Sequence, residues 1–203
     1  MMLRPVAQDQ TLPISVASAN TALRIRNTFE NEVLERKLWA AVEYLEWRSG
    51  RLFRQTTLEA SFLDWPTGCD EVLTIAAAPV RDVTAVEYRD AAGAWQEITD
   101  PTSWDWRRTD TGAEVFFFSG FSPPALSSEY PERVRVTVEA GYYARAEVET
   151  GADPEVIMPA RLEEAILSLA GHWFANREAV TTGEKAAVPL SLKTVVDSIT
   201  IYR

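Results

Sequence analysis

The apolar residues of this chain follow a helical period near both ends and a strand period in the middle. Between Thr28 and Ser49 they recur at intervals of three and four, which places them on one stripe of a helix. They are Leu34, Leu38, Ala41 and Leu45. Gly50 follows and suits the left-handed residue that ends a helix. A shorter helix is predicted from Ser15 to Leu23, with the Ser15 side chain as its N-cap.

From about Leu52 to Tyr143 the period changes to two, which predicts β-strands. The clearest strand is Arg133–Ala140, where valines alternate with polar residues. Turn-forming residues separate further short strands, which we expect at 72–75, 82–89, 95–98, 104–107 and 114–118. Turns at this spacing predict a small antiparallel β region inserted between helices.

A second long helix is predicted from Arg161 to Ala179, with Pro159 in its first turn. Its apolar face comprises Leu162, Ala165, Ile166, Leu169 and Trp173. The sequence therefore predicts an α+β protein, in which a helical scaffold of two long helices and shorter ones carries an inserted antiparallel β region. The expected segments are an extended N-terminal arm (1–14), N-terminal helices (15–51), the β-rich insertion (52–145), the long C-terminal helix (155–180) and a C-terminal tail (181–203), all within one structural domain.

Composition narrows the classes of protein to consider. The chain has 203 residues, of which 46% are hydrophobic and 25% charged, so it can form a buried core. No stretch approaches the roughly 20 apolar residues that span a bilayer, and residues 1–10 lack the apolar region of a secretory signal. We therefore expect no membrane association. The formal net charge of −10 disfavours a protein that binds nucleic acid along a basic stripe.

Cysteine and histidine, which are common in catalytic and metal sites, are scarce in this chain. Cys69 is the single cysteine and His172 the single histidine, so one chain cannot form a disulfide, a cysteine-rich metal site or a histidine cluster. Neither of the glycine-rich phosphate-binding motifs occurs. We expect His172 to pack on the flank of its helix and Cys69 to be an unreactive thiol in a turn. We therefore expect no catalytic, cofactor or metal site, and no enzymatic activity.

One alternative function follows from the residues alone. Trp104 and Trp106 lie beside Asp105 on one predicted strand, and Glu114 lies on the next. Aromatic rings beside a pair of carboxylates are compatible with a module that binds or cleaves carbohydrate. Because the chain has 30 acidic residues, such pairs also arise by chance, and this interpretation is kept as the alternative.

The first long helix has aromatic residues on the side opposite its apolar stripe. Trp39, Glu43 and Trp47 lie about 140° to 220° from that stripe. Tryptophans on such a face need a cover, which either the β region of the same chain or another protein chain would supply. We expect these three residues to lie in an interface with another subunit or partner.

The second long helix has small residues opposite its apolar stripe. They are Ser168, Gly171 and Ala175. Gly171 in the middle of a helix costs about 1 kcal/mol relative to alanine, which close packing of another element would explain. A tolerated glycine explains the residue equally well, and the small-residue face is our second candidate for a subunit interface.

Three further segments carry recognisable motifs. Residues 78–93 combine a proline, a strand and the sequence Tyr-Arg-Asp-x-x-Gly, and residues 134–142 form a strand that ends in Gly-Tyr. Residues 159–180 form a helix that ends in His-Trp-Phe-Ala-Asn-Arg-Glu-Ala-Val. In this order the segments resemble the head–tail connector family (adaptor or head-completion proteins) of tailed phages, which includes the adaptors of phage-like gene transfer agents. The earlier helix that ends in Arg-Ser-Gly-Arg at 48–51 fits the same family.

The resemblance implies a structural role. Such proteins form a ring of about twelve copies beneath the portal, join a DNA-filled capsid to the tail and continue the DNA channel. The implied partners are the portal protein, a tail-side connector or stopper protein and further copies of the chain, while DNA passes through without specific binding. The implied location is the head–tail junction of a virion or phage-like particle, made in the bacterial cytoplasm. A tail-completion protein of the same particle is a related alternative.

In this family the C-terminal segment reaches towards the portal, which here implies Thr194 to Arg203. Its apolar residues alternate with polar ones, which favours its addition to a partner as a strand. The expected portal contacts are Val195, Ile199, Ile201, Tyr202 and Arg203. We expect a chain lacking this segment to fold. The charge of −10 per copy suits an acidic channel that repels DNA, and equally a surface that only maintains solubility.

Overall fold

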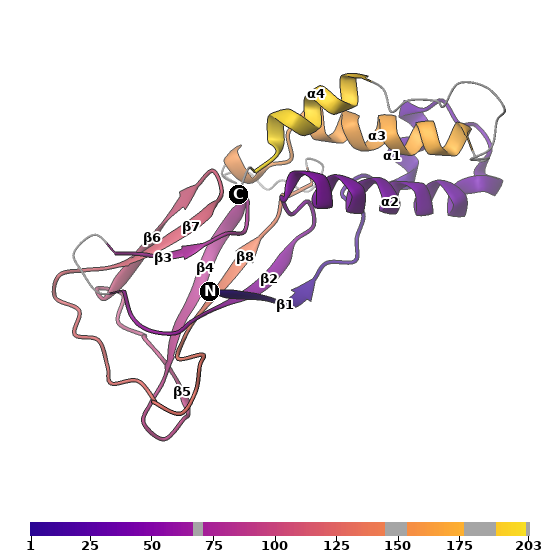
Figure 1. Cartoon of the computed structure of the whole chain (residues 1–203). Helices are drawn as coiled ribbons and strands as arrows, with labels where there is room; N and C mark the ends of the chain where they lie inside the picture. Colours follow the sequence, from indigo (N-terminus) through magenta and orange to yellow (C-terminus); the bar gives the residue numbers. More distant parts are fainter. Residues whose placement is uncertain (67–70, 145–153, 177–189, 202–203) are drawn as a thin grey trace. The chain divides into compact units, whose positions relative to one another are not determined.

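The computed structural model of the chain describes residues 1–66, 71–144, 154–176 and 190–201. These residues group into two compact units, one from 1–9 and 54–142 (the β unit) and one from 10–53 and 143–203 (the helical unit). The strands lie in the β unit and the α-helices in the helical unit, so the predicted α+β class is confirmed (Figure 1). Within the described residues, no helix has both the length and the apolar character required to cross a bilayer.

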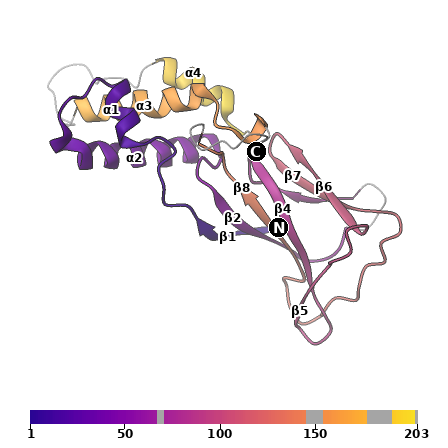
Figure 2. The ribbon, with the colours of Figure 1, turned by 180° about the vertical axis from the view of Figure 1, so that it is seen from behind.

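Over residues 1–9, 54–66 and 71–142, the β unit contains two antiparallel sheets. The larger sheet has the strand order β1-β2-β8-β4-β5, so β8 lies between β2 and β4 in both views (Figures 1 and 2). Its strands are β1 (Met2–Gln8), β2 (Thr56–Phe62), β4 (Val80–Arg89), β5 (Trp95–Glu97) and β8 (Val134–Ala140). The smaller sheet has the order β3-β7-β6. Its strands are β3 (Leu73–Ile75), β6 (Trp104–Thr109) and β7 (Gly112–Phe117).

Strand β8 lies at the centre of the larger sheet, and its residues alternate strictly between buried and partly exposed. The inward side chains of this strand are fully buried, and they are Val134, Val136, Val138 and Ala140. Val86 of β4 is paired with Val136 and is also fully buried. In the smaller sheet Val115 and Ile75 are fully buried in the same way. The period-two pattern therefore defines one apolar face for each sheet.

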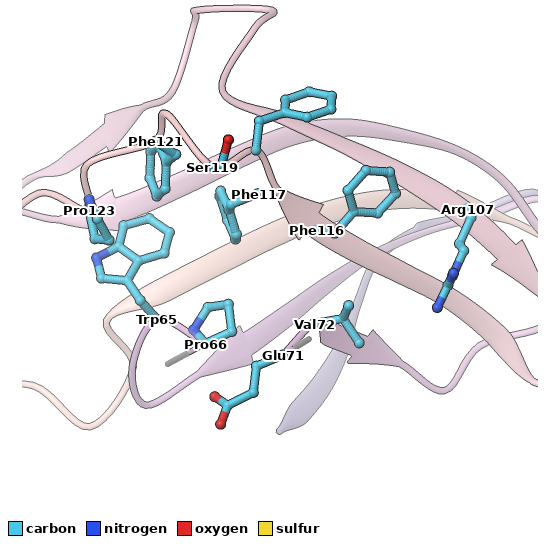
Figure 3. Close-up of a pocket in the computed structure, with 11 residues that line it drawn as sticks. Trp65, Pro66, Glu71, Val72, Arg107, Phe116, Phe117, Ser119, Phe121 and Pro123 are labelled. Carbon is cyan, nitrogen blue, oxygen red and sulfur yellow. The ribbon is translucent and has the colours of Figure 1, made fainter. Parts of the chain in front are cut away.

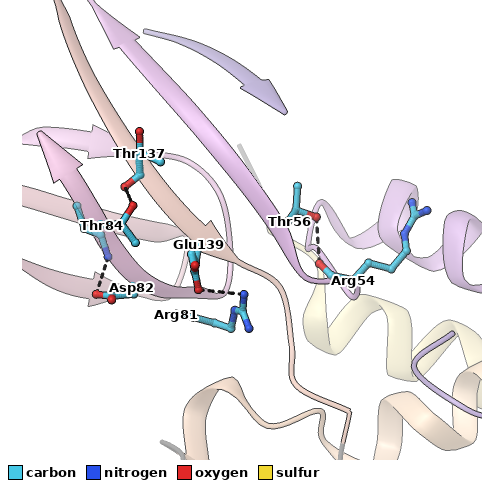
Figure 4. A network of polar contacts seen from close by, with 8 residues as sticks. Arg54, Thr56, Arg81, Asp82, Thr84, Thr137 and Glu139 are labelled. Atoms are coloured by element: carbon cyan, nitrogen blue, oxygen red, sulfur yellow. Dashed lines mark hydrogen bonds and ion pairs between the residues drawn. The ribbon is translucent and has the colours of Figure 1, made fainter. Parts of the chain in front are cut away.

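The other face of the larger sheet is polar. Arg81 on β4 donates a hydrogen bond of 3.3 Å to the Glu139 carboxylate on β8 (Figure 4). The Thr84 hydroxyl donates to the main-chain carbonyl of Thr137 at 3.3 Å, again from β4 to β8. These side-chain contacts supplement the backbone ladder at the two points where β4 departs from regular pairing, Arg81 between Val80 and Asp82 and Thr84 between Val83 and Ala85.

Among its described residues, the helical unit contains four α-helices: α1 (Val16–Ala22), α2 (Asn31–Ser49), α3 (Ala160–Ala175) and α4 (Leu190–Ile199). The two longer ones have 19 residues (α2) and 16 residues (α3), and they pack against each other. The apolar side chains buried on α2 are Leu34, Leu38, Ala41, Val42 and Leu45. Those buried on α3 are Leu162, Ala165, Ile166, Leu169 and Ala170. The predicted apolar stripes are therefore the faces that form the core of this unit.

The helix ends follow the predicted capping residues. The Ser15 hydroxyl accepts a hydrogen bond of 3.1 Å from the Ser18 N–H at the start of α1, which confirms Ser15 as an N-cap. Gly50 has φ of 70° at the end of α2, and its N–H donates to the Glu46 carbonyl at 2.9 Å. A residue with a β-carbon is strained at this φ, so glycine is the favoured residue there.

Two segments differ from the pattern-based assignment. Residues 2–8 of the predicted arm are extended and form β1, an edge strand that pairs with β2. The C-terminal segment, which we expected to be extended, instead forms the helix α4. The strand prediction for that segment is wrong because Val195 and Ile199 are four residues apart, a spacing that fits the helical period as well as period two.

Candidate functional site

The hairpin of β6 and β7 separates the residues of the predicted carbohydrate site. Arg107 is directly opposite Glu114 in the register, and Asp105 lies on the same face as Arg107. Trp104 and Trp106 lie on the opposite face of the sheet. Arg107 binds the Glu114 carboxylate at 2.6 Å, and the Asp105 carboxylate accepts the Trp106 N–H at 2.8 Å. The tryptophans and the carboxylates therefore do not converge on one site.

The single histidine and the single cysteine are placed as follows. His172 lies in the last turn of α3, half-buried, with Nδ1 3.4 Å from the Asn176 amide nitrogen. Cys69 lies outside the described residues. Across the described ranges, no group of three histidine, cysteine or carboxylate side chains is arranged to hold a metal ion.

The aromatic face of α2 is open at its C-terminal end. Trp47 is 76% exposed, although tryptophan is costly to leave in water. Its ring lies 6.3 Å from that of Tyr44, and the Tyr44 ring meets the edge of Trp173 on α3 at 5.9 Å. Glu43 is exposed, whereas Trp39 is half-buried. We name the cluster of Glu43, Tyr44, Trp47 and Trp173 the helix patch.

The small-residue face of α3 has a partner within the same unit. A β-carbon added at Gly171 would lie 2.8 Å from Cδ2 of Leu23, the residue that caps α1. The close approach that we expected at Gly171 is therefore made by this chain's own Leu23. Ser168 and Ala175 are exposed, so they remain candidates for an interface with another subunit.

The C-terminal segment packs on the other helices. Val196 is buried, and Val195 and Ile201 are half-buried. The Ile201 N–H donates to the Ser49 carbonyl at 2.9 Å, at the end of α2. The Ile199 side chain, Tyr202 and Arg203 lie outside what the structure describes. Deleting the segment from Thr194 onward would remove buried apolar surface, so we expect the truncated chain to be less stable than the full chain.

The β unit contains a cavity that the sequence pattern did not indicate. It has a volume of about 720 Å³ and lies beside β7 (Figure 3). Aromatic rings form much of its wall, with Trp65, Phe117 and Phe121 at one end and Phe116 at the other. We name it the aromatic pocket.

The aromatic rings around Trp65 in the pocket wall pack closely on one another. Trp65 is only 7% exposed, and its indole N–H donates to the Pro124 carbonyl at 3.0 Å. The Phe117 and Phe121 rings stack at 4.5 Å, and each meets the Trp65 ring edge-on at about 5.5 Å. These contacts hold the three rings against one another in the pocket wall.

The outer part of the pocket is exposed and partly charged. Phe116 and Phe118 are alternate residues at the end of β7, so they lie on the same face, with their rings 5.9 Å apart. Phe118 is exposed, as are Asp64 beside Trp65 and Glu71 on the pocket wall. The run of three phenylalanines at 116–118 was the sequence signal that could have indicated this surface.

Comparisons with known proteins identify similar folds. No protein-family model matches the chain, and no curated protein is significantly similar in sequence. A chain of a structure described as the virion of a native gene transfer agent (GTA) particle is similar, with a TM-score of 0.70 and 24% identity. A chain from the neck of an empty GTA particle, computed with C6 symmetry, has a TM-score of 0.69 and 24% identity. A chain from the neck of a native GTA particle, computed with C12 symmetry, has a TM-score of 0.64 and 22% identity.

Each of these similarities covers 100% of this chain and 97% of the other one. The shared fold therefore includes both the β unit and the helical unit. At these identities the similarity establishes the fold.

Proposed function

We propose that this chain is a structural protein of the neck of a phage-like particle, namely a head–tail adaptor. In this role copies of the chain form a ring beneath the portal, join the DNA-filled head to the tail and continue the DNA channel. The observation that carries the proposal is the full-length similarity to chains of gene transfer agent virion and neck structures. The ordered motifs at 78–93, 134–142 and 159–180 support it independently of the fold.

The surface of the chain suits assembly. Trp47 in the helical unit and Phe118 in the β unit are large apolar side chains left in water. A subunit of a ring needs two different contact surfaces, because each copy meets one neighbour on either side. Large exposed aromatic residues are the kind that anchor such contacts. Exposed aromatic residues in both units therefore support a ring-forming role.

The net charge suits a subunit that surrounds DNA without holding it. Each copy contributes a formal charge of −10, and a ring multiplies that charge. Basic residues along a channel would exchange counterions with phosphates and retain the DNA. An acidic channel would repel the phosphates and leave the DNA free to move. The same charge also opposes self-association of free subunits, so we expect the ring to form on the portal as a template.

The assembly can be tested with purified components. The chain is purified alone and with the portal protein of the same particle, and both samples are measured by size-exclusion chromatography with light scattering. We expect a monomer alone and a ring on the portal, with symmetry visible by electron microscopy. A stable dimer under both conditions, with no ring, would contradict the proposal.

Contact between α4 and the portal can be tested without deleting residues that pack in the helical unit. Asp197 is exposed on α4, so Asp197→Arg should leave the fold unchanged. If α4 faces the portal, this charge reversal should weaken binding to the portal at least tenfold. Glu97→Arg on β5 is the matched control, because Glu97 is also an exposed acidic residue. Equal binding by both variants would exclude α4 from the contact.

A further inference from the structure

The segment before α2 exposes a phenylalanine almost completely. Phe29 is 95% exposed, in the 3-10 turn Thr28–Glu30. Isolated apolar residues on a surface are common, but a side chain of this size without any cover is costly in water. The residues before it are charged, since Arg24 and Arg26 are both exposed. We name residues 24–29 the Phe29 loop.

The backbone of the Phe29 loop is held in a defined conformation. Arg24 has φ of 56°, which is unfavourable for a residue with a side chain. The Phe29 N–H donates to the Asn27 side-chain oxygen at 2.9 Å. Just beyond the loop, the Asn20 amide donates to the Asn31 side chain at 2.8 Å, which joins α1 to α2. Strained backbone held in this way is typical of segments that present a side chain for function.

The aromatic pocket of the β unit has the properties needed to receive this loop. Its wall is formed largely by aromatic rings, which favour edge-on contact with another ring. Its volume of about 720 Å³ exceeds the volume of one side chain, so the pocket could also hold residues next to Phe29. Glu71 lines the pocket, and the exposed Asp64 directly precedes the lining residue Trp65 in the chain. The lining residue Arg107 forms an ion pair with Glu114. Acidic side chains therefore lie on and next to the pocket wall, whereas the Phe29 loop contains two arginines.

We propose that Phe29 of one copy inserts into the aromatic pocket of the next copy in the ring, with Arg24 and Arg26 facing Asp64 and Glu71. This inference rests on the proposed function, because it assumes a ring. A protruding loop and a receiving pocket are two different surfaces of the same chain. A contact between two such surfaces is head-to-tail, and repetition of a head-to-tail contact closes a ring. Opposite charges on the two surfaces also overcome, locally, the repulsion between copies that each carry −10.

Site-directed cross-linking on the portal tests the contact directly. In a Cys69→Ser background, Phe29→Cys is placed on one chain and Ser119→Cys, on the pocket wall, on another. We expect a short bismaleimide to join the two chains into dimers and nothing larger. A chain with both substitutions should give a ladder of oligomers up to the full ring. Phe29→Cys with Glu97→Cys is the control pair and should not be joined.

The outcomes separate this contact from the proposed function. Rings that form on the portal without a link between positions 29 and 119 would overturn the contact and leave the adaptor role standing. A link confined to monomers of the double variant would show that the loop occupies the pocket of its own chain, which also overturns the proposal. If wild-type chains form no ring on the portal, the proposed function fails, and the contact fails with it.

A second variant measures the contribution of the phenylalanine. Because Phe29 is 95% exposed, Phe29→Ala should leave the melting temperature unchanged. It should raise the protein concentration needed for half-maximal ring assembly by at least about tenfold, as expected for an aromatic anchor. Val6→Ala on β1 is the control, since Val6 is also exposed. Equal assembly by the two variants would contradict the proposed contact.

Discussion

Arg135 and Glu87 are directly opposite each other on strands β8 and β4, and they form two hydrogen bonds of 2.8 Å between guanidinium and carboxylate. The same guanidinium lies 3.3 Å from the Glu59 carboxylate on β2 and 4.3 Å from the centre of the Trp95 ring. The bond to Glu87 is the main reason that the pKa of Arg135 is raised. One side chain on β8 therefore contacts the three other strands β4, β2 and β5 on the outer face of the larger sheet.

We expect Arg135→Lys to lower the free energy of unfolding by about 1–2 kcal/mol, measured by chemical denaturation. Lysine keeps the charge but cannot form the double hydrogen bond or cover Trp95 in the same way. The estimate is at the lower end for charged pairs because the Arg135 side chain is still 21% exposed. Arg36→Lys on α2 is the control, since its pair with Glu32 is exposed, and it should change stability by less than about 0.5 kcal/mol. Equal effects would contradict a structural role for Arg135.

The contact of Leu23 with Gly171 predicts a coupling between two substitutions. In a Leu23→Ala background, Gly171→Ala should stabilise the protein by up to about 1 kcal/mol, because alanine is the better helix former. In the wild-type background this gain should be lost, since the new β-carbon would lie 2.8 Å from Leu23 Cδ2 and displace that side chain. A double-mutant cycle by urea denaturation should therefore give a coupling of about 1 kcal/mol. Additive effects would show that the Leu23 side chain can move away from the new β-carbon without a loss of stability.

The turn between β4 and β5 predicts a pH dependence. Asp90 accepts hydrogen bonds from the Gln96 amide at 3.0 Å and from the Ala92 and Ala94 N–H groups at 2.9 and 3.0 Å. These bonds, that of Gln96 first, lower the pKa of Asp90 from 3.8. Since the folded pKa is the lower one, the stabilisation is complete above pH 3.8 and is lost as the pH falls through the folded pKa.

We expect Gln96→Ala to move the pKa of Asp90 back towards 3.8, measured by NMR titration of the carboxyl carbon. The pKa of Asp100 should not move, because it is lowered by hydrogen bonds from Thr102 rather than by Gln96. An unchanged pKa of Asp90 would show that the backbone donors alone determine it.

The parts of the fold that were predictable are those where one period dominates. The stripe of α2 that contains Leu34 and Leu38 and the alternation of β8 both reflect burial on one face, which the sequence records directly. The segment 190–199 was assigned wrongly because its apolar spacing suits two periods, and only packing against α2 and α3 distinguishes them. The chain end at residues 2–8 gains its structure from pairing with residues 56–61, a long-range contact that no local pattern encodes.

The candidate surfaces also divide into those that the sequence pattern could predict and those that depend on the folded structure. The position of Trp39 and Trp47 opposite the apolar stripe of α2 followed from the sequence, but only Trp47 is exposed, because exposure also depends on what packs against the helix. The aromatic pocket could not be predicted, since residues near 65, 72, 107, 117 and 121 meet only when the smaller sheet has formed and the loops after β2 and β7 have packed. The predicted carbohydrate site failed for a related reason, because sequence proximity does not show that neighbouring strand residues face opposite sides.

Substitutions at two tryptophans should distinguish effects on stability from effects on assembly, because one is exposed and the other is buried. Trp47 is 76% exposed in the helix patch, whereas Trp65 is 7% exposed and packs against Phe117 and Phe121. Trp65→Ala should therefore lower the free energy of unfolding by about 3–5 kcal/mol, and Trp47→Ala by less than about 0.5 kcal/mol, both measured by chemical denaturation.

Assembly should depend on Trp47 despite this small effect on stability. If the helix patch is an interface of the ring, truncating its exposed anchor should cost about 2 kcal/mol of binding free energy per contact, or roughly thirtyfold in affinity. The measurement is the concentration dependence of ring formation on the portal, with Glu43→Gln as a conservative change in the same patch. Normal assembly of folded Trp47→Ala would remove the helix patch from the interface. Loss of assembly together with a large loss of stability would instead show that Trp47 supports the helical unit itself, contrary to its exposure.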